Sequence, residues 1–190
     1  MAGKEDYRVV KTKKALMTAF DTLIRAKKFE DITINELCDE AGVRRATFYK
    51  HFTDKYDFLA YAIRLPREEF DRKVWRRGEP DGSCEYYVKY AEALITYFSE
   101  NTEIASSILG SDHSHSIIGM LIEQNCADTK VRLDKSMEGG LRLSVSTETM
   151  ANILTGGITL VVARWFEDGM TTPKEKLIGE ISLIIDALLT

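Results

Sequence analysis

Residues 32–59 read ITINELCDEAGVRRATFYKHFTDKYDFL, and two short segments with helical spacing of apolar residues meet there at Ala41-Gly42-Val43. Glycine permits the sharp backbone reversal that such a junction needs, and the valine beside it can fill the angle between two helices. The stretch therefore predicts a helix-turn-helix.

The first helix of this pair is predicted to begin after Thr33. Its hydroxyl can accept a hydrogen bond from the helix, while Glu36, three residues later, can reach back to the threonine N–H, which makes a capping box. Ile34, Leu37 and Ala41 then fall on one face at i, i+3 and i+7. That face must pack against another element.

The second helix should bury Phe48 and Phe52, which lie four residues apart. This turns a group of polar side chains outward, namely Arg44, Arg45, Thr47, Lys50 and His51. A helix that begins with two arginines can enter the major groove of DNA and place guanidinium groups against O6 and N7 of guanine. Hydroxyl, imidazole and ammonium donors beside it could hold phosphates, and these are Thr47, Tyr49, His51 and Lys55.

The order of capped helix, AGV turn, TFYKHF over 47–52 and then Asp54-Lys55 resembles the TetR family of regulators. The similarity is strong over residues 7–60, and an all-helical chain of 190 residues fits the family's size. The resemblance implies that bases are read by Arg44, Arg45 and Ala46. It implies that phosphates are held by Thr33, Thr47, Tyr49, His51 and Lys55, and that Phe48 and Phe52 are core positions.

Structural roles compete with some of these assignments. Thr33 caps a helix whether or not DNA is bound. Two arginines on a helix are usually a solvated charged face, and only their position after the turn favours base contact. Tyr49 could belong to the core, although Phe48 and Phe52 already fill the inward face.

Charge is distributed unevenly along the chain, whose net charge is −4. Residues 1–60 hold 12 Lys and Arg against 10 Asp and Glu, whereas residues 61–190 hold 14 against 20. Only the first part suits a polyanion. Basic residues near the start of the chain, Lys11 among them, can add phosphate contacts.

Several features indicate a cytoplasmic protein with no membrane segment. The first residues show no apolar stretch ahead of a cleavage site, so no signal peptide is expected. The longest apolar run, Ile158–Ala163, is too short to span a bilayer. Cys38, Cys84 and Cys126 are odd in number and scattered, which favours reduced thiols over a disulfide or a zinc site.

Helical periodicity without alternating strand patterns predicts an all-α fold of about nine helices. A helix over 7–27 should close a three-helix N-terminal domain, and a fourth should begin at Thr53 or Asp54 and run to a kink at Pro66. Residues 78–82 should form a loop, followed by helices over 83–99, 102–110 and 114–135. We assign residues 1–60 to a DNA-binding domain and residues 61–190 to an effector-binding and dimerisation domain.

The last two helices carry more apolar surface than a monomer is expected to hide. Ser146 should cap one that ends at Gly169, and Thr172, Pro173 and Glu175 should begin the other. Two such helices from each subunit would form a four-helix bundle across a two-fold axis, unless the pair packs only within its own subunit. The predicted dimer interface comprises Ile153, Gly157, Val161, Ile178, Ile181 and Ile185.

The family resemblance implies that a small molecule binds the C-terminal domain and lowers affinity for DNA. Aromatic and methionine side chains could line its pocket, although such residues at helical spacing are commonly plain core; they are Trp75, Tyr86, Tyr90, Phe98, Met120 and Trp165. Residues 156–170, GGITLVVARWFEDGM, are similar to the TetR subset that includes regulators of dihydroxyacetone kinase operons. His113 and His115 favour a loop cap over a metal site, so no metal or other cofactor is expected.

Catalytic motifs are absent from the sequence: it has no glycine-rich phosphate loop, H-E-x-x-H or G-x-S-x-G, so an enzyme is not expected. The sequence predicts a homodimeric, ligand-responsive regulator that binds a pseudo-palindromic operator, more in keeping with a repressor than an activator. The alternative is a co-activator or adaptor of the same fold that acts mainly through a partner protein.

Overall fold

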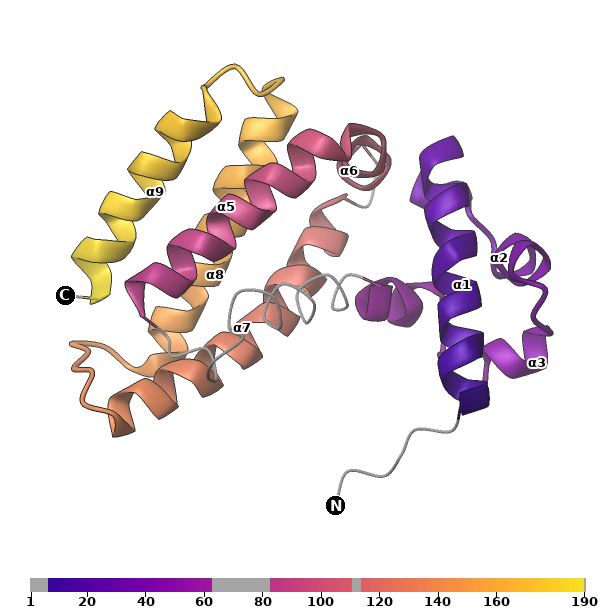
Figure 1. Ribbon diagram of the computed structural model, residues 1–190, viewed down its shortest axis with the longest axis horizontal. Coiled ribbons are helices and arrows are strands. Elements are labelled where there is room, and N and C mark those ends of the chain that lie inside the picture. The colour runs from indigo at the N-terminus through magenta and orange to yellow at the C-terminus, as the bar shows by residue number, and fades with distance from the viewer. Residues whose placement is uncertain (1–6, 63–82, 111–113, 190) are drawn as a thin grey trace.

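The computed structural model describes residues 7–62, 83–110 and 114–189, and within these ranges every regular element is a helix (Figure 1). The N-terminal elements are α1 (Tyr7–Ala26), the 3-10 turn η1 (Phe29–Asp31), α2 (Ile34–Ala41), α3 (Arg45–Phe48) and a helix over residues 55–62. The later helices are α5 (Cys84–Glu100), α6 (Thr102–Leu109), α7 (Ser114–Glu138), α8 (Thr147–Glu167) and α9 (Lys174–Leu189). The all-α prediction is confirmed. Pro66, Trp75, His113 and the loop expected at 78–82 lie outside the described residues.

A cluster of aromatic rings holds the N-terminal helices together. Phe20 of α1 meets Phe58 edge-on with ring centroids 5.4 Å apart, and Phe58 meets Phe52 at 5.1 Å. Phe48 of α3 is fully buried and lies 5.4 Å from Phe52. Because edge-on and tilted rings pack well without polar partners, the cluster fixes α3 against α1 and the 55–62 helix.

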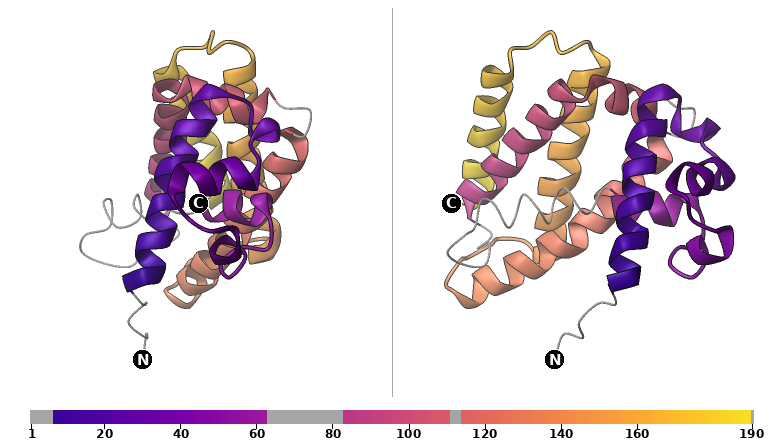
Figure 2. Two further views of the ribbon diagram at one scale, coloured as in Figure 1. Left: turned by 90° about the vertical axis from the view of Figure 1, so that its right-hand side faces the viewer. Right: turned by 45° about the vertical axis from the view of Figure 1, so that its right-hand side comes forward.

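The C-terminal helices form a second core. Helix α5 packs against α8 and α9, and α7 packs along α8 (Figures 1 and 2). The buried side chains here include Tyr86, Leu154, Ile158, Val162 and Ile185. Inside the core the Thr155 hydroxyl donates to the Thr129 hydroxyl at 3.0 Å, so two buried polar groups of α7 and α8 satisfy each other.

Helix α6 connects the two cores. The Ser107 hydroxyl donates to the Lys27 carbonyl at 2.7 Å, and Arg25 of α1 donates to Glu103 at 3.4 Å and to Asn101 at 3.3 Å. Ile104 of α6 and Ile117 of α7 are buried in the N-terminal cluster. The N-terminal helices therefore pack directly on α6 and the start of α7.

The turn between α8 and α9 differs slightly from the prediction. Helix α9 begins at Lys174, and its first hydrogen bonds go to the Pro173 carbonyl, so the helix starts one residue later than expected. The Thr172 carbonyl instead accepts a hydrogen bond from the Trp165 indole at 2.7 Å. Ser146 caps α8 as predicted, and Gly169, with φ of 72°, follows its C-terminal end.

Candidate nucleic-acid interface

The predicted capping box at the start of α2 is confirmed. The Glu36 N–H donates to the Thr33 hydroxyl at 3.2 Å, and the Thr33 N–H donates to the Glu36 carboxylate at 3.0 Å. The Thr33 hydroxyl also donates to that carboxylate at 2.8 Å, and Lys27 binds its other oxygen at 2.6 Å. These bonds engage the Thr33 hydroxyl within the fold, which favours its structural role over a phosphate contact.

Gly42 makes the reversal between α2 and α3. Its backbone is left-handed, with φ of 62° and ψ of 30°, and its N–H donates to the Asp39 carbonyl at 3.1 Å. The Val43 N–H reaches back to the Cys38 carbonyl at 2.9 Å. A Cβ at Gly42 would meet no atom within 4 Å, so backbone conformation rather than space is what requires glycine here.

Helix α3 is shorter than the predicted second helix. Arg44 is its N-cap and has extended backbone, with φ of −70° and ψ of 141°, so Arg45 is the first helical residue. A turn continues the segment: the His51 N–H donates to the Phe48 carbonyl at 2.9 Å, and the Phe52 N–H donates to the same oxygen at 3.0 Å. Buried Phe48 and Phe52 thus set which face of the segment points outward.

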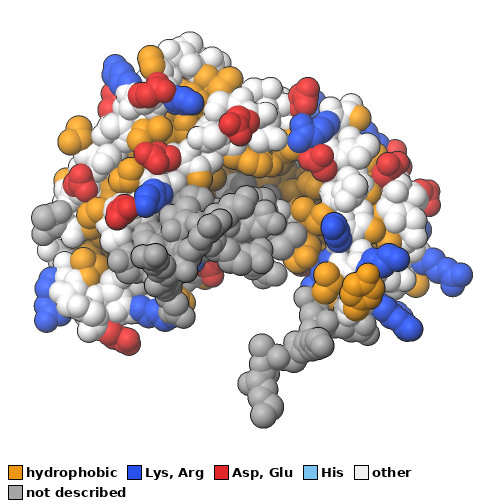
Figure 3. Space-filling model, in the orientation of Figure 1, with side chains coloured by type: hydrophobic (Ala, Val, Ile, Leu, Met, Phe, Trp, Pro, Cys, Tyr) orange, Lys and Arg blue, Asp and Glu red, His pale blue; other side chains and the backbone are white. Residues whose placement is uncertain are grey.

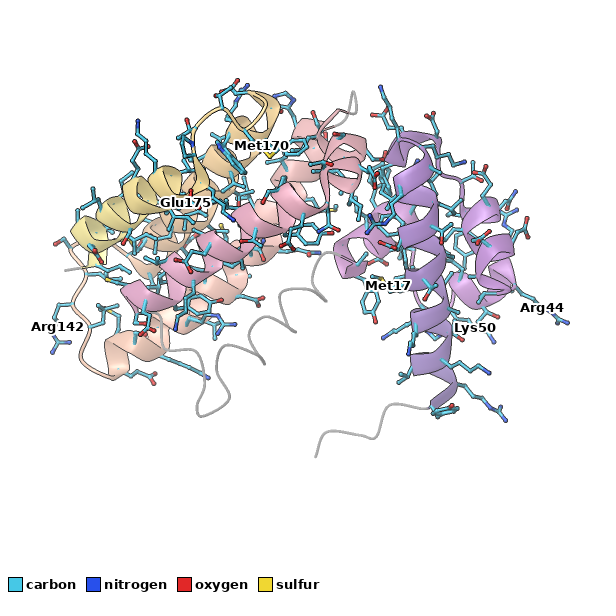
Figure 4. All side chains as sticks on the ribbon, turned by 45° about the horizontal axis from the view of Figure 1, so that its top comes forward. Met17, Arg44, Lys50, Arg142, Met170 and Glu175 are labelled. Carbon is cyan, nitrogen blue, oxygen red and sulfur yellow. The ribbon has the colours of Figure 1, made fainter. Side chains whose placement is uncertain are left out.

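The outward face is basic. Arg44, Arg45, Ala46 and Lys50 are all exposed. Figure 3 shows Lys and Arg side chains gathered at the end of the molecule that carries α3, and in Figure 4 Arg44 projects from that end away from α1. Positive charge at an exposed helix start matches what a groove lined by phosphates requires.

Tyr49 packs against an apolar neighbour on one side and is exposed to solvent on the other. Its ring meets Phe48 edge-on at 5.5 Å, yet 48% of the residue is exposed. The Arg45 guanidinium lies over the ring, 5.9 Å from its centroid. Tyr49 is therefore not a core residue, and stacking on its ring can help to orient Arg45. Of the other predicted phosphate-binding residues, Lys11 is exposed, and Thr47 and His51 are half-buried.

Lys55 has a different position from the one expected of a phosphate-binding residue. Its ammonium donates to the carbonyls of Phe29 at 3.3 Å, Glu30 at 2.7 Å and Ile32 at 3.3 Å, and lies 4.9 Å from the centroid of the Phe29 ring. Burial lowers the pKa of Lys55, and the nearby carboxylates of Glu30 and Asp31 oppose that shift. The three carbonyl acceptors can take all three ammonium hydrogens, so Lys55 links η1 to the 55–62 helix by hydrogen bonds. The sequence pattern did not predict η1, and without that turn these partners could not be identified.

The predicted dimer-interface residues separate into two groups. Ile153, Gly157 and Val161 of α8 are exposed, whereas Ile181 and Ile185 of α9 are buried in the subunit's own core and Ile178 packs against it. The interface prediction is therefore wrong for the buried α9 residues. The outward apolar residues of α9 are Leu183, 72% exposed, and Ile184, 59% exposed. The apolar stripe of α9 is so wide that periodicity alone did not fix which part faces inward.

The predicted effector residues do not all come together. Tyr90 and Phe98 line a cavity of about 380 Å³ between the N-terminal helices and α5, α6, α7 and α8. Tyr86 and Trp165 lie elsewhere in the C-terminal core, where the Arg132 guanidinium covers the Tyr86 ring at 4.8 Å. Met120 packs against the N-terminal cluster. The side chains of α1 and α6 that line this cavity were not predicted from the sequence.

The three cysteines lie on three different helices, α2, α5 and α7. Cys38, Cys84 and Cys126 are free thiols, and burial raises the pKa of Cys38. The described part of the chain contains no group of three or more His, Cys, Asp or Glu placed to hold a metal ion. None of the helices in these ranges combines the length and the apolar character needed to cross a bilayer.

Comparison with known proteins agrees with this geometry. Residues 16–62 match the profile of the family described as "Bacterial regulatory proteins, tetR family". An uncharacterized HTH-type transcriptional regulator of Bacillus subtilis, YxbF, is 40% identical over 91 residues, which are 47% of this chain but 23% of that protein. The chain thus spans about a quarter of the length of this curated relative.

Solved structures share the fold across nearly the whole chain. A TetR-family regulator from Rhodococcus sp. superposes with a TM-score of 0.67 at 16% identity, covering 95% of this chain and all of that one. The dihydroxyacetone kinase operon activator DhaS has a TM-score of 0.58 at 18% identity, covering 94% of this chain and 96% of that one. At these identities the similarity shows the fold alone.

The capping box makes stability sensitive to acid. The pKa of Glu36 is lowered from 4.5 to about 2, first by the hydrogen bond from Lys27 and then by the N–H and hydroxyl of Thr33. A carboxylate whose pKa is lowered by folding stabilises the fold above its unfolded pKa, and this contribution is lost as pH falls toward the folded value. Between pH 4.5 and 2 the free energy of unfolding should therefore fall more steeply for the wild type than for Glu36→Gln. Urea denaturation across that range measures this, with Glu40→Gln on the same helix as control; parallel curves for Glu36→Gln and wild type would contradict it.

Lys55 should act on stability. Lys55→Met gives an uncharged side chain that is one atom shorter and removes three charge-assisted hydrogen bonds at a partly exposed site, so we expect a loss of about 1–2 kcal/mol in the free energy of unfolding. Lys50→Met removes an exposed lysine from the same segment and should change stability little. Equal denaturation midpoints for the two variants would contradict a structural role for Lys55.

Proposed function

The chain belongs, by its N-terminal domain and its fold, to the TetR family of bacterial regulatory proteins, and we propose that it is a ligand-responsive transcriptional repressor. It would bind a pseudo-palindromic operator as a homodimer, in the cytoplasm where that DNA lies. The first part of the chain, residues 1–60, would bind DNA, and residues 61–190 would bind the effector and a second subunit. Ala62 also packs in the N-terminal cluster, so that cluster extends two residues past this boundary.

The observation that carries this proposal is the exposed sequence Arg44-Arg45-Ala46 at the start of α3, held outward by the buried ring of Phe48. Arginine forks at the start of a recognition helix suit bidentate contacts with guanine. We assign base reading to these three residues. Phosphate contacts are assigned to Thr47, Tyr49, His51 and Lys11, with Thr33 mainly a cap and Lys55 omitted because its ammonium is already bonded.

Dimerisation is proposed through the outward face of α8 and α9. We define this dimer face by the exposed residues Ile153, Gly157, Leu160 and Val161 of α8 and Leu183 and Ile184 of α9. Within α8 these residues recur at intervals of three or four, so they form one stripe, and on α9 the two exposed residues are adjacent. Exposed apolar residues on two helices that follow each other in the chain support a four-helix bundle with a second copy, which would present two DNA-binding domains to one operator.

The sign of regulation and any further partner need an experiment. DhaS, a fold neighbour, is by its title an operon activator, and an adaptor that works through a second protein is the other candidate. Fluorescence anisotropy of the purified chain with DNA flanking its own gene, against a scrambled duplex at two salt concentrations, tests whether the chain needs such a partner. Salt-sensitive preference for the flanking DNA would support a self-sufficient regulator, whereas equal weak binding to candidate operators across the genome would favour the adaptor.

Arg45 should contribute sequence preference. Because Arg45→Ala removes a bidentate contact with a base, it should reduce the free-energy difference between the preferred and the other bases at one operator position by about 1–3 kcal/mol. The preferences at the other positions should stay unchanged. Lys11→Ala is the control: it should weaken binding to every duplex equally and reduce the salt slope by about one unit. Anisotropy on a set of singly substituted operators measures both, and a uniform loss for Arg45→Ala would rule out its base-reading role.

The dimer face should be sensitive to charge. Ile184→Glu places a carboxylate where two copies would meet, so we expect the variant to be monomeric in sedimentation velocity experiments. Val131→Glu makes the same kind of change at an exposed position on α7 and should leave the dimer intact. A wild-type-like dimer for Ile184→Glu would exclude this face.

A further inference from the structure

The cavity between the two cores has walls from both parts of the chain. The N-terminal part contributes Met17, Phe20, Asp21 and Ile24 of α1 with Leu59 and Ala62 of the 55–62 helix. The C-terminal part contributes residues of α5, α6, α7 and α8. In Figure 4 Met17 lies on the side of α1 that faces the C-terminal helices. At about 380 Å³ the cavity is large enough for a small organic ligand.

The lining is apolar and carries no cation among the residues that the structure describes. Asp21 supplies the one carboxylate of the described lining, and both of its oxygens bind the Arg25 guanidinium at 3.2 Å. The phenol of Tyr97 stays neutral over a wider pH range, because burial first, and then Asp21, raises its pKa. An anionic ligand buried here would find no described partner for its charge, and burying an unpaired charge is strongly unfavourable.

One hydroxyl in the cavity wall is left without a partner. The Thr159 side-chain oxygen on α8 is buried and makes no hydrogen bond within the described structure. A threonine in a helix commonly bonds the carbonyl four residues earlier, and nearly all buried polar groups have a partner. A hydroxyl of this kind on the wall of a cavity is a ready contact for a ligand's polar atom.

We infer that this cavity binds an uncharged, mainly apolar small molecule whose hydrogen-bonding group meets the Thr159 hydroxyl. The inference deepens the proposed function, because that molecule would be the effector. A ligand there touches α1 and α6 together, and these helices are already joined by the bond from Ser107 to the Lys27 carbonyl. Occupancy would therefore favour one placement of the DNA-binding helices over another.

Three ten-carbon probes test the charge and polarity of the ligand: 1-decanol, decanoate and decylamine at pH 7. Isothermal titration of the purified full chain should give decanol an affinity at least tenfold above those of the two charged probes. Tighter binding of decanoate or decylamine would overturn the assignment to neutral ligands, and no binding of any probe would overturn the inference as a whole.

Two variants test the place of binding. Thr159→Val keeps the shape but removes the hydroxyl, so decanol affinity should fall about 3- to 10-fold, as for one lost hydrogen bond. Thr149→Val makes the same change on the exposed start of α8 and should have no effect. Ala163→Leu fills the cavity and should abolish binding. Unchanged decanol affinity in Thr159→Val would overturn the role of its hydroxyl, whether or not Ala163→Leu folds.

Operator binding, measured by anisotropy with and without decanol, separates this inference from the proposed function. Loss of DNA affinity on adding decanol, diminished in Thr159→Val, supports both. Operator binding without any decanol binding would support the proposed DNA-binding function and overturn the ligand inference. Decanol binding by a protein that binds no specific DNA keeps the cavity assignment and overturns the regulatory role.

Discussion

The buried ring of Phe48 is the contact on which the DNA-binding surface depends. Helix α3 has four residues, too few to be stable alone, so its orientation comes from packing rather than from its own hydrogen bonds. Phe48 is locked between Phe52 and Phe58, and this fixes the outward direction of Arg44 and Arg45. The base-reading assignment thus rests on an apolar contact on the opposite side of the helix.

Local signals in the sequence predicted local structure well. The Thr33 and Glu36 pair, Gly42 and the spacing of Phe48 and Phe52 each act within a few residues, and each has its predicted role in the fold. Features that depend on distant contacts were not predictable in the same way. Lys55 finds its carbonyls in a turn more than twenty residues earlier, and the rotation of α9 follows from which isoleucines fit against α5 and α8. The cavity combines side chains from α1 to α8, so no single stretch of sequence could reveal it.

The seam between the two cores, where α6 meets α1, would connect the proposed DNA-binding and effector-binding parts of the chain. Asn101, Glu103 and Ser107 all contact α1 or the residue after it, so α6 cannot shift without changing those bonds. The same seam contains the cavity, whose walls include residues of both helices. A molecule in the cavity and an operator at α3 would therefore be linked through a few contacts on α1.

The N-terminal cluster is built almost entirely from one continuous stretch, residues 16–62, and is completed by Ile104 and Ile117. Contacts that are close in sequence form early, and the N-terminal part of a chain leaves the ribosome first. During synthesis this domain can fold before α6 and α7 have been made. The apolar surface that Ile104 and Ile117 cover in the complete fold is then still exposed to water. The nascent chain therefore passes through a stage with an exposed apolar surface, and the contacts of α6 and α7 with the N-terminal helices first serve to cover it.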